Sequence, residues 1–124
     1  MRDDDPAILD LLPLPAAALY IVTVLGNGPM HGYGLMSHIR DLSAGAVTLG
    51  PGTLYGSIKR MLAQGLLVEA TDRPDSDGGD GRRRYYELTD LGRHVAAAEH
   101  ARLANLLAAA RPKPMRRAVV RPAT

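Results

Sequence analysis

Apolar residues recur with helical spacing in three segments of the N-terminal half of the chain. A repeat at intervals of three and four residues places side chains on one face of an α-helix. Each segment ends at a glycine-rich or polar stretch, such as Gly26–Pro29 after the first and Gly65 after the third. The predicted helices are residues 14–27, with Leu19, Val22 and Leu25 facing inward; residues 31–42, with Leu35, Ile39 and Leu42; and residues 51–64, with Leu54, Ile58, Met61 and Leu62.

The second half of the chain predicts a β-hairpin followed by one long helix. Residues 66–71 and 82–88 have the length and composition of strands, and a polar loop, residues 72–81, joins them. Thr89 is suited to cap a helix over residues 90–110. The apolar positions of this helix drift around its axis: Leu91, Val95 and Ala98 share one face, whereas Leu103, Leu106, Leu107 and Ala110 share a rotated one. We expect the first face to pack on its own domain and the second on another surface.

This order of elements predicts a mainly α fold with a small β-hairpin, in the α+β class. Three helices followed by a hairpin are typical of a winged helix-turn-helix domain. We expect a loose arm at residues 1–13, the winged domain at residues 14–89, a dimerisation helix at residues 90–111 and a flexible basic tail at residues 112–124.

The net charge of +2 conceals a strong asymmetry along the chain. Residues 1–81 hold 5 basic and 10 acidic side chains, whereas residues 82–124 hold 10 basic and 3 acidic ones. A basic segment of this kind suggests a polyanionic partner. The apolar stretch Leu11–Gly26 is too short to cross a bilayer, and the acidic residues before it do not fit a signal peptide. We therefore expect a soluble cytoplasmic protein with no membrane partner.

Candidate DNA contacts gather on the third helix and the second strand. The outward face of the helix offers hydrogen-bonding groups and cations, and in a helix-turn-helix this face enters the major groove. Arg82–Arg84 would reach phosphates or a minor groove, although charge on a strand can also merely protect a sheet edge. Tyr33 is expected to be half in the core and half at a phosphate, and His31 to be a capping or turn residue. The candidate set is Tyr33, Thr53, Tyr55, Ser57, Lys59, Arg60, Arg82, Arg83 and Arg84.

The loop before these arginines carries four aspartates, Asp72, Asp75, Asp77 and Asp80. They predict either a solvated tip that stays out of the groove or a local neutralisation of Arg82–Arg84 in the free protein. The spacing excludes an EF-hand calcium loop, because Asp80 stands where that loop requires glycine.

Three blocks of sequence, in order, resemble the PadR-type transcriptional regulators. The blocks are Gly28-Pro29-Met30-His31-Gly32-Tyr33; Gly52-Thr53-Leu54-Tyr55 continuing to Gly65-Leu66-Leu67; and Gly81 through Gly92, read as the wing and its exit into the last helix. The resemblance covers roughly residues 14–110. It implies a homodimeric DNA-binding repressor whose last helix, with the first, forms the dimer interface. We expect the rotated apolar face of the last helix to bury against the partner through Leu103, Leu106 and Leu107. The resemblance also implies a small-molecule effector that tunes DNA affinity. Because a dimer presents two third helices to successive major grooves of double-stranded DNA, we expect a roughly palindromic operator.

No catalytic or metal-binding pattern is present in the sequence. The chain has no cysteine, and its four histidines lack the spacing of a metal site on a helix. We therefore expect no enzyme activity, no catalytic or metal-ligating residue and no cofactor. An activator or dual regulator remains an alternative within the class, and a protein–protein adaptor that does not touch DNA is the alternative from another class.

Overall fold

The computed structural model describes residues 2, 4–70 and 84–110 of the 124-residue chain, and these form five helices and three strands. The expected helices and both expected strands are present with their ends shifted by a few residues. In chain order the elements are α1 (Pro6–Leu9), α2 (Ala16–Leu25), β1 (Met30–His31), α3 (Gly32–Leu42), α4 (Pro51–Ala63), β2 (Leu67–Ala70), β3 (Tyr85–Leu88) and α5 (Asp90–Ala109).

The three strands form an antiparallel sheet in the order β1-β3-β2. Leu67 pairs with Leu88 and Ala70 with Tyr85, which confirms the hairpin, whereas Met30 pairs with Tyr86. The strand β1 was not expected, because two residues are too short to show an alternating pattern. Its pairing attaches the start of α3 to the wing, so the helix-turn-helix and the hairpin hold a defined relation to each other.

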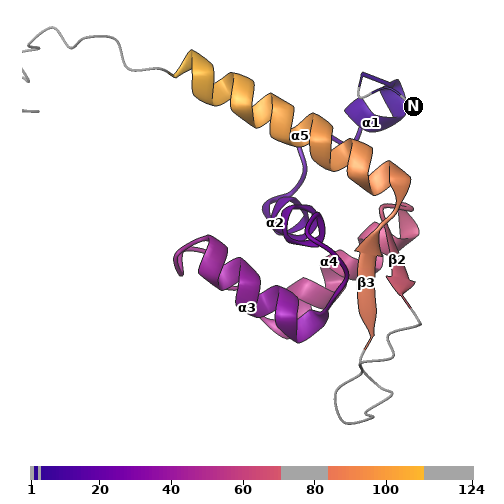
Figure 1. Ribbon diagram of the computed structural model, residues 1–124, viewed down its shortest axis with the longest axis vertical. Coiled ribbons are helices and arrows are strands. Elements are labelled where there is room, and N and C mark those ends of the chain that lie inside the picture. Colours follow the sequence, from indigo (N-terminus) through magenta and orange to yellow (C-terminus); the bar gives the residue numbers. More distant parts are fainter. Residues whose placement is uncertain (1, 3, 71–83, 111–124) are drawn as a thin grey trace, which may run out of the picture.

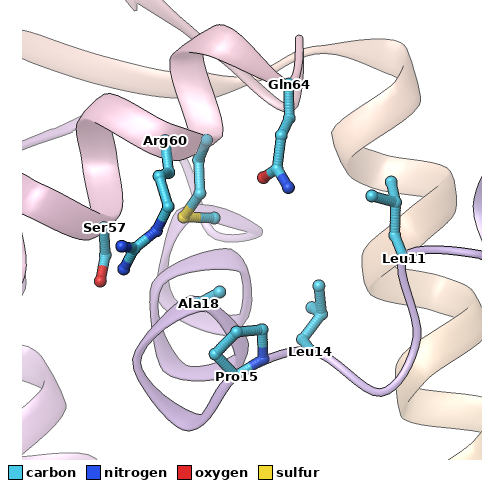
Figure 2. A pocket seen from close by; sticks show the side chains of 8 residues that line it. Leu11, Leu14, Pro15, Ala18, Ser57, Arg60 and Gln64 are labelled. Atoms are coloured by element: carbon cyan, nitrogen blue, oxygen red, sulfur yellow. The ribbon is translucent and has the colours of Figure 1, made fainter.

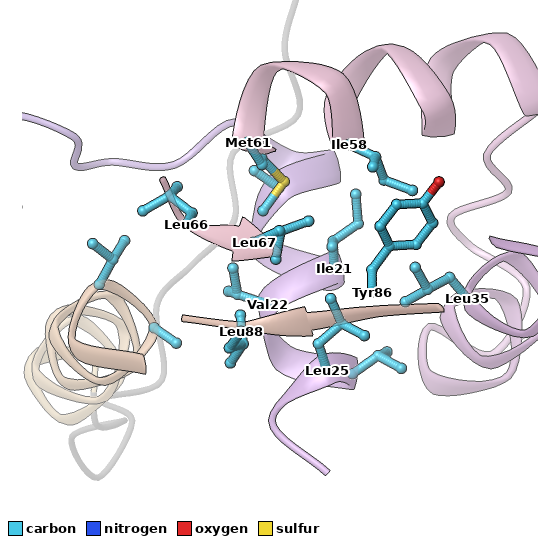
Figure 3. Packing of buried hydrophobic residues seen from close by; sticks show 14 of the residues in the cluster. Ile21, Val22, Leu25, Leu35, Ile58, Met61, Leu66, Leu67, Tyr86 and Leu88 are labelled. Carbon is cyan, nitrogen blue, oxygen red and sulfur yellow. The ribbon is translucent and has the colours of Figure 1, made fainter. Parts of the chain in front are cut away.

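The hydrophobic core lies where α2 meets the sheet and helices α3, α4 and α5 (Figure 1). The aromatic ring of Tyr86 packs among aliphatic residues, with Ile58 and Leu35 on either side of it in Figure 3. Its burial, reinforced by the nearby Glu69 carboxylate, raises the pKa of the Tyr86 phenol above its usual value. The buried residues of α2 are Ala18, Ile21, Val22, Val24 and Leu25, a wider face than the expected stripe because α2 is covered on several sides.

The expectation of a loose N-terminal arm is wrong for the part of it that the structure describes. Asp5 caps the short helix α1 by accepting a hydrogen bond from the Ala7 N–H at 3.0 Å. The side chain of Ile8 is completely buried, and α1 packs against α5. A single buried apolar side chain in a four-residue helix shows no periodicity, so this docking has no clear signature in the sequence.

The helix α5 begins on the sheet and extends beyond the rest of the fold (Figure 1). Thr89 caps it as expected, accepting from the Gly92 N–H at 3.0 Å, while the Thr89 N–H donates to the Leu66 carbonyl at 3.0 Å. Val95 and Ala98 are buried as predicted, whereas residues 104–110 are all exposed. The first half of α5 is thus part of the core, and the second half has no partner within the described residues.

Candidate nucleic-acid interface

The helix α4 presents a continuous polar face to solvent. Thr53 and Lys59 are exposed on it, and Gly56 lies between them with no atom within 4 Å of the position that a side chain would take. Gly50, which precedes α4, provides no side-chain cap, so the first backbone N–H groups of the helix are not capped by a side chain. The face therefore offers a cation, a hydroxyl and helix N–H groups in one place, which suits a phosphate backbone.

Tyr55 lies at the edge of this face and packs across the start of α3. Its side chain is 40% exposed, and a Cβ atom added at Gly32 would come within 2.2 Å of the Tyr55 hydroxyl oxygen. Glycine at position 32 therefore lets the two helices approach. This contact packs the hydroxyl end of Tyr55 against the start of α3 and leaves part of the ring exposed.

Ser57 does not lie where the sequence placed it. Its side chain is only 5% exposed, since residues 54, 57, 58 and 61 together form the buried stripe of α4, while Leu62 is only partly buried. The sequence analysis built the α4 stripe from apolar residues alone and therefore included Leu62. Burial in the structure follows the position on the helix, so Ser57 takes a place in the stripe. A side chain this buried offers little surface to a phosphate, contrary to the expectation.

Arg60 is exposed, but it borders a pocket as well as the polar face of α4. The pocket lies between α4, the start of α2 and the segment that joins α1 to α2, and its volume is about 120 Å³. Figure 2 shows Arg60 of α4 and Gln64, which follows α4, on the side of the pocket across from Pro15 and Ala18 at the start of α2. The lining residues are Leu11, Leu14, Pro15, Ala18, Ser57, Arg60, Met61 and Gln64.

The wing contributes one described arginine. Arg84 is exposed just before β3, and its guanidinium lies 3.4 Å from a carboxylate oxygen of Glu69 on β2. An ion pair this exposed contributes little stability, so Arg84 is free to exchange Glu69 for another anion. Arg82, Arg83 and the aspartates of the loop lie outside the described residues.

The start of α3 holds the remaining candidates. His31 caps the helix as expected: its Nδ1 accepts a hydrogen bond from the Gly34 N–H at 3.1 Å. The His31 ring also meets the Tyr85 ring edge-on, at 5.5 Å between centroids. Tyr33 is 69% exposed, so the expectation of a half-buried ring is wrong, and most of its side chain is available to a partner.

A buried carboxylate that the sequence analysis missed connects α5 to the start of α2. Glu99 is fully buried; its carboxylate accepts the Leu14 N–H at 2.8 Å and two hydrogen bonds from Arg102, from Nε at 2.5 Å and from Nη2 at 3.1 Å. The next residue of α5, His100, has its Nε2 2.8 Å from the Thr23 hydroxyl of α2. A glutamate three residues before an arginine was visible in the sequence, but its burial depends on contacts from distant segments.

The hydrogen bonds from Arg102, with that from Leu14, hold the pKa of Glu99 below its usual value. The unfolded chain therefore takes up the proton first as the pH falls, so this stabilisation is present above the usual carboxyl pKa and is lost on acidification. Glu99→Gln is expected to lower the thermal midpoint at neutral pH and to flatten its decline in acid. Thermal unfolding followed by circular dichroism across this pH range measures both effects.

Glu87→Gln on β3 is the matched control, since the Glu87 side chain makes no ion pair or hydrogen bond within the described residues. An acid decline equally steep in wild type and Glu99→Gln would contradict the assignment.

The leucines expected at a dimer interface lie on the free half of α5. Leu106 and Leu107 are 60% and 75% exposed, and Leu103 is half-buried.

Within the described residues, no helix has the length and apolar character needed to cross a membrane. No three metal-ligating side chains come together there.

Known proteins resemble this chain in sequence and in fold. The model of the transcriptional regulator PadR-like family matches residues 21–98. An uncharacterized 37.1 kDa protein in transposon TN4556 of Streptomyces fradiae is 32% identical over 90 residues, which are 73% of this chain but only 24% of that protein. The chain thus spans about a quarter of the length of the curated relative it matches.

Among solved structures, a PadR family transcription regulator from Clostridium difficile superimposes with a TM-score of 0.65 and 25% identity, covering 77% of this chain and 94% of that one. Bacillus subtilis PadR, solved in complex with operator DNA, gives a TM-score of 0.59 at 20% identity over 88% of this chain and 54% of its own. These likenesses confirm the winged-helix fold. With the family match over most of the described residues, they show that the chain belongs to the PadR-like family of transcriptional regulators.

Proposed function

We propose that this protein is a homodimeric, sequence-specific DNA-binding repressor. The observation that carries the proposal is the exposed polar face of α4, with Thr53 and Lys59 on it and Arg84 of the wing beyond it. In a winged helix, such a helix enters the major groove while the wing holds the adjacent backbone. The solved complex of Bacillus subtilis PadR with operator DNA supports this reading, because the two chains share the fold.

The proposed contacts fall into two groups. Thr53, Tyr55, Lys59, Arg60 and the exposed Tyr33 are assigned to the major groove and its phosphates, whereas Arg84, with Arg82 and Arg83 outside the described residues, is assigned to flanking phosphates. Ser57 is removed from the set by its burial. A cation that neutralises a phosphate releases a counterion, so binding should weaken as salt rises.

The proposed assembly is a dimer through α5. Two copies would present two α4 helices about one DNA turn apart, which requires a roughly palindromic operator. Residues 14–89, now joined by the docked α1, form the DNA-binding domain, residues 90–111 the dimerisation helix and residues 112–124 a basic tail. We place the protein in the cytoplasm, where its DNA is, and we extend the family's effector-dependent control to it.

The test measures binding to the DNA upstream of the protein's own gene. Fluorescence anisotropy gives the affinity at several salt concentrations. Lys59→Ala is expected to weaken binding roughly tenfold and to reduce the slope of log affinity against log salt by about one. Thr53→Ala should reduce the preference for the operator over random DNA without changing that slope.

Arg93→Ala is the matched control, because Arg93 is an exposed cation on the first turn of α5 whose one ion pair within the described residues is with the exposed Asp90. It should leave affinity and slope unchanged. Equal losses in Lys59→Ala and Arg93→Ala, or no salt-dependent binding in the wild type, would contradict the assignment of α4. An adaptor that does not touch DNA predicts the latter result.

A further inference from the structure

Gly56 lies at the centre of the outward face of α4. The buried residues of this helix are Leu54, Ser57, Ile58 and Met61. With about 3.6 residues per turn, position 56 points almost directly away from them. The exposed Thr53 and Lys59 stand about one turn to either side of it. Gly56 therefore lies among the side chains assigned to the major groove, and it leaves a gap between them.

The fold gives no reason for a glycine at this position. The described glycines with a positive φ are Gly28, Gly45 and Gly65, so Gly56 needs no conformation that an alanine could not adopt. A Cβ atom added at Gly32 or Gly92 would collide with a neighbour, whereas one added at Gly56 has no atom within 4 Å. Neither backbone conformation nor packing within the described residues explains Gly56.

Glycine at position 56 lowers the stability of the helix. Gly56 is the sixth of the 13 residues of α4, and glycine in a helix interior is less favourable than alanine. Gly50 and Gly52 are equally open, but they lie at the N-cap and in the first turn, outside the helix interior. Of these three, Gly56 alone weakens the helix without a gain inside the fold, which points to a gain outside it.

We propose that Gly56 is a specificity-determining residue for DNA, because its missing side chain lets the α4 backbone lie against the edges of the base pairs. This inference rests on the proposed function, in which α4 enters the major groove. A methyl group at position 56 would hold the helix back from the base pairs. Thr53 and Lys59 would then lose contact with the bases, because a hydrogen bond is lost when its two atoms separate by about 1 Å more.

Gly56 acts on the choice of sequence rather than on the affinity for DNA in general. Random DNA is held mainly by its phosphates, which long cationic side chains reach without close approach of the helix. Base edges lie inside the groove, so reading them requires the helix itself to enter. An added side chain therefore weakens the operator complex and leaves the non-specific complex largely unchanged.

The test compares Gly56→Ala with the wild type, using the full chain and an operator that the wild type selects from a random-sequence library. Thermal unfolding should show a midpoint raised by roughly 2–5 °C, because alanine favours the helix. Fluorescence anisotropy should show operator binding weakened roughly tenfold, as much as one mismatched base pair costs. Binding to random DNA should change less than about threefold, and the slope of log affinity against log salt should stay the same, because no phosphate contact is lost.

Gly56→Leu and Ala63→Leu form a matched pair. Both place a leucine at an exposed position of α4, and Ala63 lies two turns farther from the N-terminal end that enters the groove. Gly56→Leu should weaken operator binding roughly 100-fold or more, whereas Ala63→Leu should leave it within about twofold of the wild type.

A raised midpoint with unchanged operator affinity in Gly56→Ala would overturn the proposal. Equal losses on operator and random DNA, or equal losses in Gly56→Leu and Ala63→Leu, would overturn it as well. A wild type without salt-dependent binding to any DNA contradicts the proposed function itself. DNA binding that Lys59→Ala weakens and Gly56→Ala does not contradicts the role of Gly56 alone.

Discussion

Leu106→Asp is expected to yield a folded monomer that binds operator DNA roughly 100-fold or more weakly than the wild type, because the avidity of two linked half-sites is lost. Leu106 and Leu107 expose large apolar side chains on the part of α5 that touches nothing else in the described residues. An aspartate placed in an apolar interface would be buried without a counter-charge.

The matched control is Asn105→Asp, one position earlier on the same exposed turn. It adds the same charge, but position 105 lies on the side of the helix away from the leucines, so the dimer should persist. Light scattering gives the mass, circular dichroism the fold and anisotropy the DNA affinity. A stable dimer in Leu106→Asp would remove α5 from the interface.

Gly92→Ala is expected to destabilise the described fold strongly. A Cβ atom at position 92 would lie 2.1 Å from the Leu66 carbonyl oxygen, which is backbone and already accepts the Thr89 N–H. Either α5 or the α4–β2 turn must move. We expect a loss of about 3 kcal/mol, the upper part of the usual range for overpacking, and a fall in the thermal midpoint of about 12 °C or more.

Gly56→Ala is the matched control, because nothing lies within 4 Å of its added methyl group and position 56 is inside a helix. It should stabilise the protein by roughly 0.5–1 kcal/mol through the helix propensity of alanine. Thermal unfolding of the two variants should therefore move in opposite directions. Similar midpoints would mean that α5 does not pack on Leu66 as described.

The elements that the sequence predicted well are those that repeat over several turns. Most of the α4 stripe, the inward positions Leu35 and Ile39 of α3, the cap at Thr89 and the two longer strands all depend on neighbours within about ten residues. Leu42, expected on the same inward face of α3, is 56% exposed, so that part of the prediction is wrong. The elements that it missed are short: two residues of β1 pair with β3, and one residue of α1, Ile8, enters the core.

The residues of the candidate site were also predicted correctly only where a repeating local pattern fixed their position. Lys59 and Thr53 were placed outward correctly, since a helix with a clear apolar stripe fixes its opposite face. Ser57 and Tyr33 were misplaced, because the exposure of a position beside the stripe depends on which element packs there. The role of Glu99 depends on Leu14, which is distant in sequence, and no local pattern could show that contact.

The sequence by itself determined the order of helices and strands, the outward face of α4 and the family resemblance, because periodicity, capping and motifs are local properties of the chain. Only the tertiary structure decided that α1 packs on α5 and that Ser57 lines a pocket. It also decided that the Glu99 carboxylate of α5 accepts a hydrogen bond from Leu14 at the start of α2. The physical reason is that burial and hydrogen bonding between distant segments depend on how complete elements pack, and the same residue types would be solvated on an isolated helix.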